Sequence, residues 1–358
     1  MRFRLTTGTA LTIVVIAALA AAMATGNLEF LNDATSWQLG FSVVPQAPSD
    51  PYWVTMGIAV LNTIVLAVVA VVISTVLGAA VAFIAVAGNP AWTRMATSYV
   101  QFFRNMPLIL QALFWFAVVS HMPGPRQGLH FAGAVVSNRG ASIPFFTAAG
   151  LAAVGVAILV AIVCLWVLRK LRPFQRGRSV IVPSIGTLCG LATWAVFFPG
   201  QPIWTVPELT GFNFTGGVNL PTELISILIA LSLFGSAYVA EIVRGGFETV
   251  PKGVIEAARA LALPAWVVEA KVRVPLALRA IILPLGSQYT TLIKATSIGL
   301  AIGFTDLFAV TLMSINQSGH TISLLCVMTA CFVLLNQAVV SIANVLNHEF
   351  KIPGTGGH

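Results

Sequence analysis

Charged side chains, which can bind ions or a partner protein, gather in one stretch of this chain, residues 244–284. They stand in an otherwise apolar sequence and are Arg244, Glu248, Lys252, Glu256, Arg259, Glu269, Lys271, Arg273 and Arg279. Because charge is costly in the lipid interior, such a stretch must lie in water between hydrophobic segments. We therefore predict that it contacts another protein. The simpler alternative is a solvated loop whose charges only fix the topology.

Two short helices are expected within this charged stretch. The first covers residues 252–263, with Gly253 near its start and Pro264 at its end, because proline interrupts the hydrogen bonding of a helix. The second covers residues 265–274 and ends at Pro275, before the next apolar segment.

The first of these helices carries a possible ion pair beside two alanines. Glu256 lies in the early turns, where a carboxylate complements the positive end of the helix dipole. Arg259 follows three residues later and can pair with it on one face. Ala257 and Ala258 lie between them. A helix with so small a surface can seat deep in a groove of a partner protein.

Three ionisable residues, Arg104, Glu241 and Lys294, lie inside apolar segments or at their ends. Such residues are functional candidates because their burial is costly. The planar guanidinium of Arg104 can hold a carboxylate with two hydrogen bonds, and Lys294 can attract an anion. As alternatives, Arg104 reaches the membrane surface or pairs with Glu241, and Lys294 pairs with Asp306 or Glu241.

The composition of the chain indicates that the segments containing these residues lie in a membrane. The 358 residues are 58% hydrophobic and 8% charged, whereas a soluble domain has about three times that charged fraction. Apolar runs long enough to cross a bilayer recur along the chain, which predicts an all-α polytopic membrane protein. The net charge of +8 does not indicate nucleic-acid binding, because the basic residues lie in short loops, as the positive-inside rule requires.

Eight transmembrane helices are predicted from these runs. They lie near residues 6–24, 54–87, 97–119, 145–168, 179–199, 222–243, 277–302 and 321–345. Placing the N-terminus in the cytoplasm puts the basic cluster at 169–178 and the charged stretch inside as well, and leaves only Arg126 and Arg139 as basic residues of the outer loops. Both termini are then cytoplasmic.

The first segment has a second interpretation. Its basic start and the sequence Ala22-Met23-Ala24 are also typical of a cleavable signal peptide. We expect an uncleaved anchor, joined by an outer connector to residue 53. Metal binding is not predicted, since the four cysteines lie in apolar segments without ligand spacing and the histidines lie in loops or at ends.

Several motifs in this chain resemble one family of transport proteins. Glu256-Ala257-Ala258, followed by an apolar stretch and Val274-Pro275, resembles the EAA loop in the membrane permease subunits of binding-protein-dependent ABC importers. Further stretches resemble its polar amino-acid branch: 61–67, 103–111, 240–246 and 294–297. Residues 204–223 and the eight-span plan are similar to the general L-amino acid permeases, which carry polar and acidic amino acids.

The resemblance implies a type I ABC-importer permease core of five spans, supplied by the second, third, sixth, seventh and eighth segments. The permease domain would cover 54–345, with an added N-terminal anchor and connector at 1–53 and a cytoplasmic tail at 346–358. Within the domain, the resemblance implies an inserted hairpin at 145–199 and a cytoplasmic coupling loop at 244–276.

In this family the EAA loop docks into a cleft of the ATP-hydrolysing subunit. The resemblance therefore implies an ATPase-coupling role for one set of residues: Gly253, Glu256, Ala257, Ala258, Arg259 and Ala262. Family members usually have glycine where this chain has Ala262, so the turn is expected to rely on Pro264 instead.

The polar residues of the core spans are the candidates for the substrate pathway. They are Arg104, Asn105, Gln111, Ser236, Glu241, Gln288, Thr291, Lys294, Thr296 and Ser297. An amino acid brings a carboxylate and an ammonium group, which Arg104 or Lys294 and Glu241 would meet. Asn62 and Thr63 are interpreted instead as contacts between helices.

The resemblance implies a translocation subunit of an ATP-driven importer of L-amino acids in the bacterial inner membrane, working by alternating access. Its partners would be a second homologous permease, two ATP-binding subunits, a periplasmic amino-acid-binding protein and membrane lipid. No enzyme activity is expected, because the chain lacks the glycine-rich phosphate loop of an ATPase. It should bind no cofactor itself, with ATP and Mg²⁺ on the partner. An ion-coupled secondary amino-acid transporter is the alternative.

Overall fold

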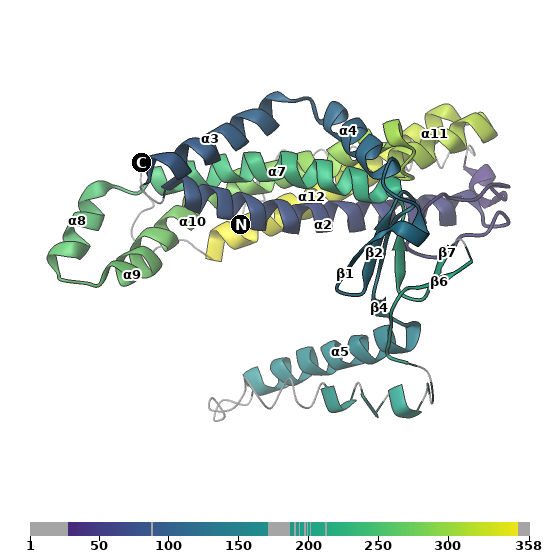
Figure 1. The fold of residues 1–358 in the computed structure, drawn as a ribbon, viewed down its shortest axis with the longest axis horizontal. Coiled ribbons are helices and arrows are strands. Elements are labelled where there is room, and N and C mark those ends of the chain that lie inside the picture. The colour runs from purple at the N-terminus through teal and green to yellow at the C-terminus, as the bar shows by residue number, and fades with distance from the viewer. Residues whose placement is uncertain are drawn as a thin grey trace, which may run out of the picture. The chain divides into compact units, whose positions relative to one another are not determined.

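The computed structural model describes residues 28–86, 89–170 and 187–349, without residues 190, 193, 197, 199, 201 and 212. Helices dominate this part of the chain (Figure 1). The α-helices are α2 (Tyr52–Val86), α3 (Pro90–Asn105), α4 (Leu108–Ser120), α5 (Ala148–Lys170), α7 (Thr222–Glu248), α8 (Lys252–Ala260), α9 (Ala265–Val268), α10 (Val274–Ala295), α11 (Leu307–Ser318) and α12 (Thr321–Glu349). Shorter turns are η1 (Glu29–Asn32), η2 (Pro125–Gln127), the π-helical η3 (Glu269–Arg273) and η4 (Thr296–Ile302).

Three of the described helices, α2, α7 and α12, are long and apolar enough to cross a membrane. Two bent helix pairs could each supply one further span: α3 with α4, and Trp266–Ile302 with α11. These elements coincide with the five segments assigned to the permease core. The total of eight is not established, because segment 6–24 and part of segment 179–199 lie outside the described residues.

The third predicted segment, 97–119, is not a straight span. Helices α3 and α4 meet at an angle of 100°, because Pro107 cannot donate to the helix and disfavours helical backbone at Met106, which is extended. The buried Gln111 side chain donates hydrogen bonds to the carbonyls of Phe103 and Met106, both at 3.0 Å. Gln111 therefore stabilises the break.

Helix α11 was not predicted, since residues 303–320 were expected to form a connection. Asp306 caps its N-terminus by accepting a 2.9 Å hydrogen bond from the amide of Ala309. Gly319 ends the helix in the left-handed conformation that glycine favours. Both capping signals are present in the sequence, and α11 packs on α2 and α12.

The segment predicted to be the coupling loop, 244–276, also differs in detail from the prediction. The π-helical η3 follows α9 directly, and Pro275 lies in the first turn of α10 rather than at a helix end. A proline is tolerated there because the first amides of a helix have no partner within it. The result is one helical run from α9 into the fourth core span.

Helix α2 packs tightly against α7 at a glycine. A Cβ atom on Gly78 would lie 2.6 Å from both the Ser236 carbonyl oxygen and the Val239 Cβ. Only glycine permits this approach. A buried cluster that includes Ala82, Val239 and Ile281 continues the contact to α10.

The connector before α2 is anchored to the helices through Asn62, which is fully buried. Its side-chain nitrogen donates to the carbonyls of Phe41 (3.0 Å) and Thr305 (2.9 Å), and its oxygen accepts from the amide of Val43 (3.0 Å). The neighbouring Thr63 hydroxyl accepts a hydrogen bond from the α11 backbone. The interpretation as a contact between helices is confirmed for Thr63, whereas Asn62 binds the connector and the segment before α11 rather than a second helix.

The chain divides into two compact units, one combining Met1–Ala117 with Glu223–His358 and the other Val118–Thr222. The second unit contains short antiparallel strands where the sequence was expected to form loops. They are β1 (Leu129–Phe131), β2 (Ala134–Ser137), β3 (Gly140–Ile143), β4 (Phe145–Phe146), β5 (Trp204–Thr205), β6 (Glu208–Thr210), β7 (Asn213–Thr215) and β8 (Val218–Leu220). Their sheet orders are β1-β2-β3-β8, β4-β5 and β6-β7. The fold is mostly helical as predicted, with these strands as an addition.

Candidate coupling loop and substrate pathway

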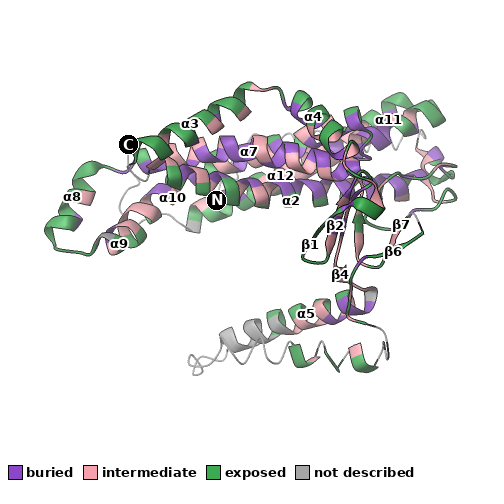
Figure 2. Cartoon of the chain, viewed as in Figure 1, coloured by how far each residue is buried: buried purple, intermediate pink, exposed green. Residues whose placement is uncertain are grey.

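Helix α8 lies between the third and fourth core spans and is exposed along most of its length (Figure 2). Ala258 is buried and Ile255 half-buried, whereas Glu256, Ala257 and Arg259 are exposed. The inner side of α8 packs on α9 and η3. Its charged face is therefore open to a partner.

Large apolar side chains are also exposed around α8. Leu261 is 76% exposed and Trp266 68%, and Val254 and Leu263 are exposed beside them. A charged loop in water gains nothing from presenting such side chains, and apolar patches rimmed by polar residues mark interaction sites. This surface, Val254, Leu261, Leu263 and Trp266 with the charged face of α8, is called the loop surface below.

The predicted pair of Glu256 and Arg259 does not form. No described residue makes an ion pair with either side chain. Both charges face solvent in the isolated chain, so both can pair with a docked protein.

The turn after α8 departs from the expectation that Pro264 would make it. Ala262 has a φ of 53°, in the left-handed region that costs a non-glycine residue about 1–2 kcal/mol. Its amide donates to the carbonyl of Arg259, and Pro264 instead begins α9 by accepting from the amides of Val267 and Val268. The turn thus has the left-handed backbone conformation that glycine favours, although the residue there is alanine.

Ala262→Gly is therefore expected to stabilise the loop by about 0.5–1 kcal/mol, the relief of backbone strain less the added entropy of the unfolded chain. Slower hydrogen exchange of the amides at 261–263 would measure it. Ala260→Gly, inside α8, is the matched control and should destabilise the helix by about 1 kcal/mol. Equal acceleration of exchange by both changes would contradict the assignment of strain to Ala262.

An ion-pair ladder runs along the C-terminal part of α7, and one of its pairs, Arg104 with Glu241, reaches the end of α3. Arg244 contacts Glu241 and Glu248, each at 2.5 Å, and Arg104 lies 4.0 Å from Glu241. The Arg104 guanidinium also lies 5.0 Å from the centroid of the Tyr238 ring. Because these side chains are more than a third exposed, each pair contributes at most about 1 kcal/mol. Of the pathway candidates, the structure thus brings Arg104 and Glu241 together.

Four other pathway candidates, Gln111, Ser236, Gln288 and Thr296, are buried. Ser236 shares a 2.6 Å hydrogen bond with the Tyr99 hydroxyl, which links α7 to α3. Thr296 donates to the Asp306 carboxylate at 3.3 Å. With Gln111 at the α3–α4 break, three of these four side chains thus lie at junctions between helical elements. The side-chain nitrogen of Gln288 is buried without a hydrogen-bond partner among the described residues.

The remaining candidates lie nearer the surface. Asn105, Thr291 and Lys294 are exposed and Ser297 is half-buried. The hydroxyls of Thr291 and Ser297 donate to backbone carbonyls of their own helix. No described residue makes an ion pair with Lys294, including Asp306 and Glu241. Lys294 is therefore free to meet a carboxylate.

Sequence reasoning assigned no role to the tyrosines of this region. Tyr99 and Tyr238 contact Ser236 and Arg104 respectively, and Tyr289 of α10 shares a 2.8 Å hydrogen bond with Thr75 of α2. The sequence did contain a signal for these contacts, because a tyrosine inside an apolar segment needs a hydrogen-bond partner for its hydroxyl. Among the described residues, no group of His, Cys, Asp or Glu side chains could hold a metal ion.

Comparisons with known proteins bear on the family of this chain. The family described as "Binding-protein-dependent transport system inner membrane component" matches residues 74–352. The putative amino-acid ABC transporter permease protein YhdX of Escherichia coli is 34% identical, over 92% of this chain and 86% of that protein. The general L-amino acid transport system permease protein AapQ of Rhizobium johnstonii is 34% identical, over 90% and 83%.

Two further matches are more distant. The glutamate/glutamine/aspartate/asparagine transport system permease protein BztB of Rhodobacter capsulatus is 28% identical, over 72% of this chain and 70% of that protein. A crystal structure of an amino acid ABC transporter with histidines aligns with a TM-score of 0.51 and 17% identity, covering 83% of this chain and 95% of that chain. At this identity the match shows a shared fold.

Proposed function

Because the chain belongs to the family of binding-protein-dependent transport system inner membrane components, among its amino-acid ABC transporter permeases, we propose that it forms one half of the translocation path of an ATP-driven L-amino-acid importer. A second homologous permease would form the other half. Two ATP-binding subunits would lie on the cytoplasmic side with both termini of this chain, and a periplasmic binding protein would deliver the amino acid.

The loop surface is the observation that carries this proposal. It offers unpaired charges on α8 and exposed apolar side chains beside them, which is the composition of a docking helix that fills a groove. In this proposal α8 seats in the ATPase subunit, which binds ATP and Mg²⁺. Movement of α8 then passes through α9 and η3 into α10, since these elements form one helical run.

The ion-pair ladder is the proposed inner gate. It holds the end of α3 against α7 through one weak pair, Arg104 with Glu241, and through the contact of Arg104 with the Tyr238 ring. A gate that opens in every transport cycle needs contacts of this kind, because stronger pairs would hold the path closed. Separation of Arg104 from Glu241 would accompany opening toward the cytoplasm.

The proposed cargo is a polar or acidic L-amino acid. The relatives named for general L-amino acid transport and for glutamate, glutamine, aspartate and asparagine transport support this class. The unpaired Lys294 on α10 supports it as well, because an ammonium group can hold the side-chain carboxylate of glutamate or aspartate.

Lys294→Ala is expected to lower uptake of glutamate about tenfold or more relative to glutamine, because a hydrogen bond to a charged group contributes about 1.5–3 kcal/mol. Competition between the two labelled amino acids in proteoliposomes measures the ratio. Lys294→Arg, which keeps the charge, should retain most of the discrimination. An equal loss for both amino acids would show that Lys294 does not bind the side-chain carboxylate, and no loss would remove Lys294 from the pathway.

Co-purification tests the proposed assembly. The tagged chain, extracted from its own cells in mild detergent, should bring with it a second permease and an ATP-hydrolysing subunit. A chain that is isolated alone and takes up an amino acid in response to an ion gradient would instead be a secondary transporter, and the proposal would fail.

A further inference from the structure

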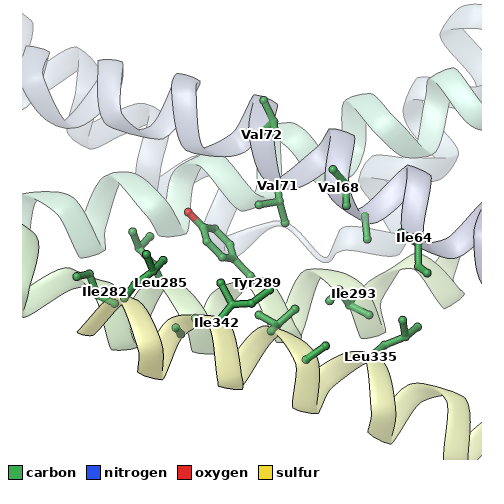
Figure 3. A pocket seen from close by; sticks show the side chains of 16 residues that line it. Ile64, Val68, Val71, Val72, Ile282, Leu285, Tyr289, Ile293, Leu335 and Ile342 are labelled. Carbon is green, nitrogen blue, oxygen red and sulfur yellow. The ribbon is translucent and has the colours of Figure 1, made fainter. Parts of the chain in front are cut away.

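An apolar cavity of about 550 Å³ opens between α2, α10 and α12 (Figure 3). Side chains such as Val68, Val72, Leu335 and Ile342 surround it, and Tyr289 is the one lining residue with a polar side-chain atom. That hydroxyl already shares a hydrogen bond with Thr75. This cavity, called the groove below, thus offers no free polar side chain to an amino acid, and we exclude the groove from the substrate pathway.

Small residues shape the floor of this groove. Ala67, Gly286, Ala338 and Ala343 line it. Gly286 also lets α10 approach α12, because a Cβ atom on Gly286 would lie 2.7 Å from that of Ala343. Small residues let helices approach closely within a membrane. The groove is therefore shaped for another apolar helix.

The apolar segment 6–24 of this chain lies outside the described residues, but the place where the described chain begins indicates its route. Phe30 of η1 stacks on His320 with ring centroids 4.0 Å apart, and packs edge-on against Tyr52 at 5.9 Å. Tyr52 begins α2 and His320 directly precedes α12. The described chain therefore begins beside the N-terminal ends of α2 and α12, two of the three helices that form the groove.

The length of the segment matches the depth of the groove. Ile64 and Val72 lie 12 and 20 residues along α2 from Tyr52 (64 − 52 and 72 − 52), which is roughly 18–30 Å at the helical rise. A helix running back from Leu28 over the same distance reaches residues 16 to 8. This part of the segment contains threonine, glycine, alanine, leucine, isoleucine and valine and no ionisable residue.

We propose that segment 6–24 occupies this groove as a helix antiparallel to α2, so that the first segment is an integral part of the permease core. Its small residues would meet the small residues of the floor. The proposal does not depend on the transported substrate or on the ATPase. Acyl chains of lipid and the partner permease are the rival occupants.

Disulfide cross-linking in the assembled complex tests the proposal. In a chain with its native cysteines replaced by alanine, Val68→Cys is paired with a cysteine at each of residues 10–13, one full helical turn at the expected depth. Val69→Cys is the matched control, because Val69 is also exposed on α2 but does not line the groove. Linked peptides are identified by mass spectrometry after oxidation in membranes.

At least one Val68→Cys pair is expected to cross-link about tenfold faster than any Val69→Cys pair, and within one chain. Mixing two singly substituted chains in one membrane separates links within a chain from links between chains. Cross-links of Val68→Cys to the partner permease, no cross-link in any of the four pairs, or a mature chain that begins after residue 24 would each overturn the proposal.

Discussion

Replacing Glu256 by lysine is expected to lower ATP-dependent amino-acid uptake about 100-fold or more while the chain still folds and enters the membrane. Glu256 is exposed on α8 and makes no ion pair with any described residue, so the isolated chain loses little. In the assembled complex, the lysine would place a positive charge in the groove of the ATPase subunit where the glutamate carboxylate had been. Loss of one member of a buried charge pair costs about 2–5 kcal/mol, and about 1.4 kcal/mol corresponds to a tenfold change.

Uptake and ATP hydrolysis by the reconstituted complex measure this loss, together with the amount of ATPase subunit that co-purifies. Glu29→Lys is the matched control, because Glu29 is an exposed glutamate in η1, far from the loop in the sequence and beside the start of α2. It should leave uptake near that of the unchanged chain. Equal uptake by the Glu256 and Glu29 variants would show that α8 is a solvated loop and not a docking helix.

Replacing Asn62 by alanine is expected to destabilise the protein by about 3 kcal/mol or more. The substitution leaves the Val43 amide and the Thr305 carbonyl without their partner at the fully buried Asn62, while the Phe41 carbonyl keeps the hydrogen bond from the Thr305 hydroxyl. Each unsatisfied buried group costs about 1–3 kcal/mol. The connector around Phe41 and the chain around Thr305 would lose their common attachment to α2.

Thermal unfolding of the complex in detergent measures the effect of Asn62→Ala. Leu61→Ala is the matched control, since Leu61 precedes Asn62 on α2 and is exposed, and it should shift the unfolding temperature little. If both variants unfold at the same temperature, the three hydrogen bonds of Asn62 do not stabilise the fold.

The long core spans could be predicted because each is a continuous apolar run in the sequence. The bend between α3 and α4 was less accessible: Pro107 marks a break, but the angle depends on how Gln111 binds the freed carbonyls. The strands of the second unit were missed for another reason. They are two to four residues long, which is too short for an alternating pattern to be recognised.

The candidate sites divide in the same way. The charge and the small side chains of α8 follow from local sequence, as does the presence of alanine at 262 where glycine is usual. The left-handed backbone at Ala262 is known only from the structure. The partners of Asn62 include Thr305, 243 residues away, and no local pattern identifies such a contact. The approach of Arg104 to Glu241 was one alternative among several until the structure gave a distance.

Uptake by a purified complex in proteoliposomes tests the central claim most directly. The chain is reconstituted with its second permease and ATP-binding subunits, and a labelled polar L-amino acid is supplied outside with the periplasmic binding protein. Accumulation should require both ATP at the cytoplasmic side and the binding protein, and should be lost in the Glu256→Lys variant. Accumulation by this chain alone, driven by a proton or sodium gradient without ATP, would contradict the account.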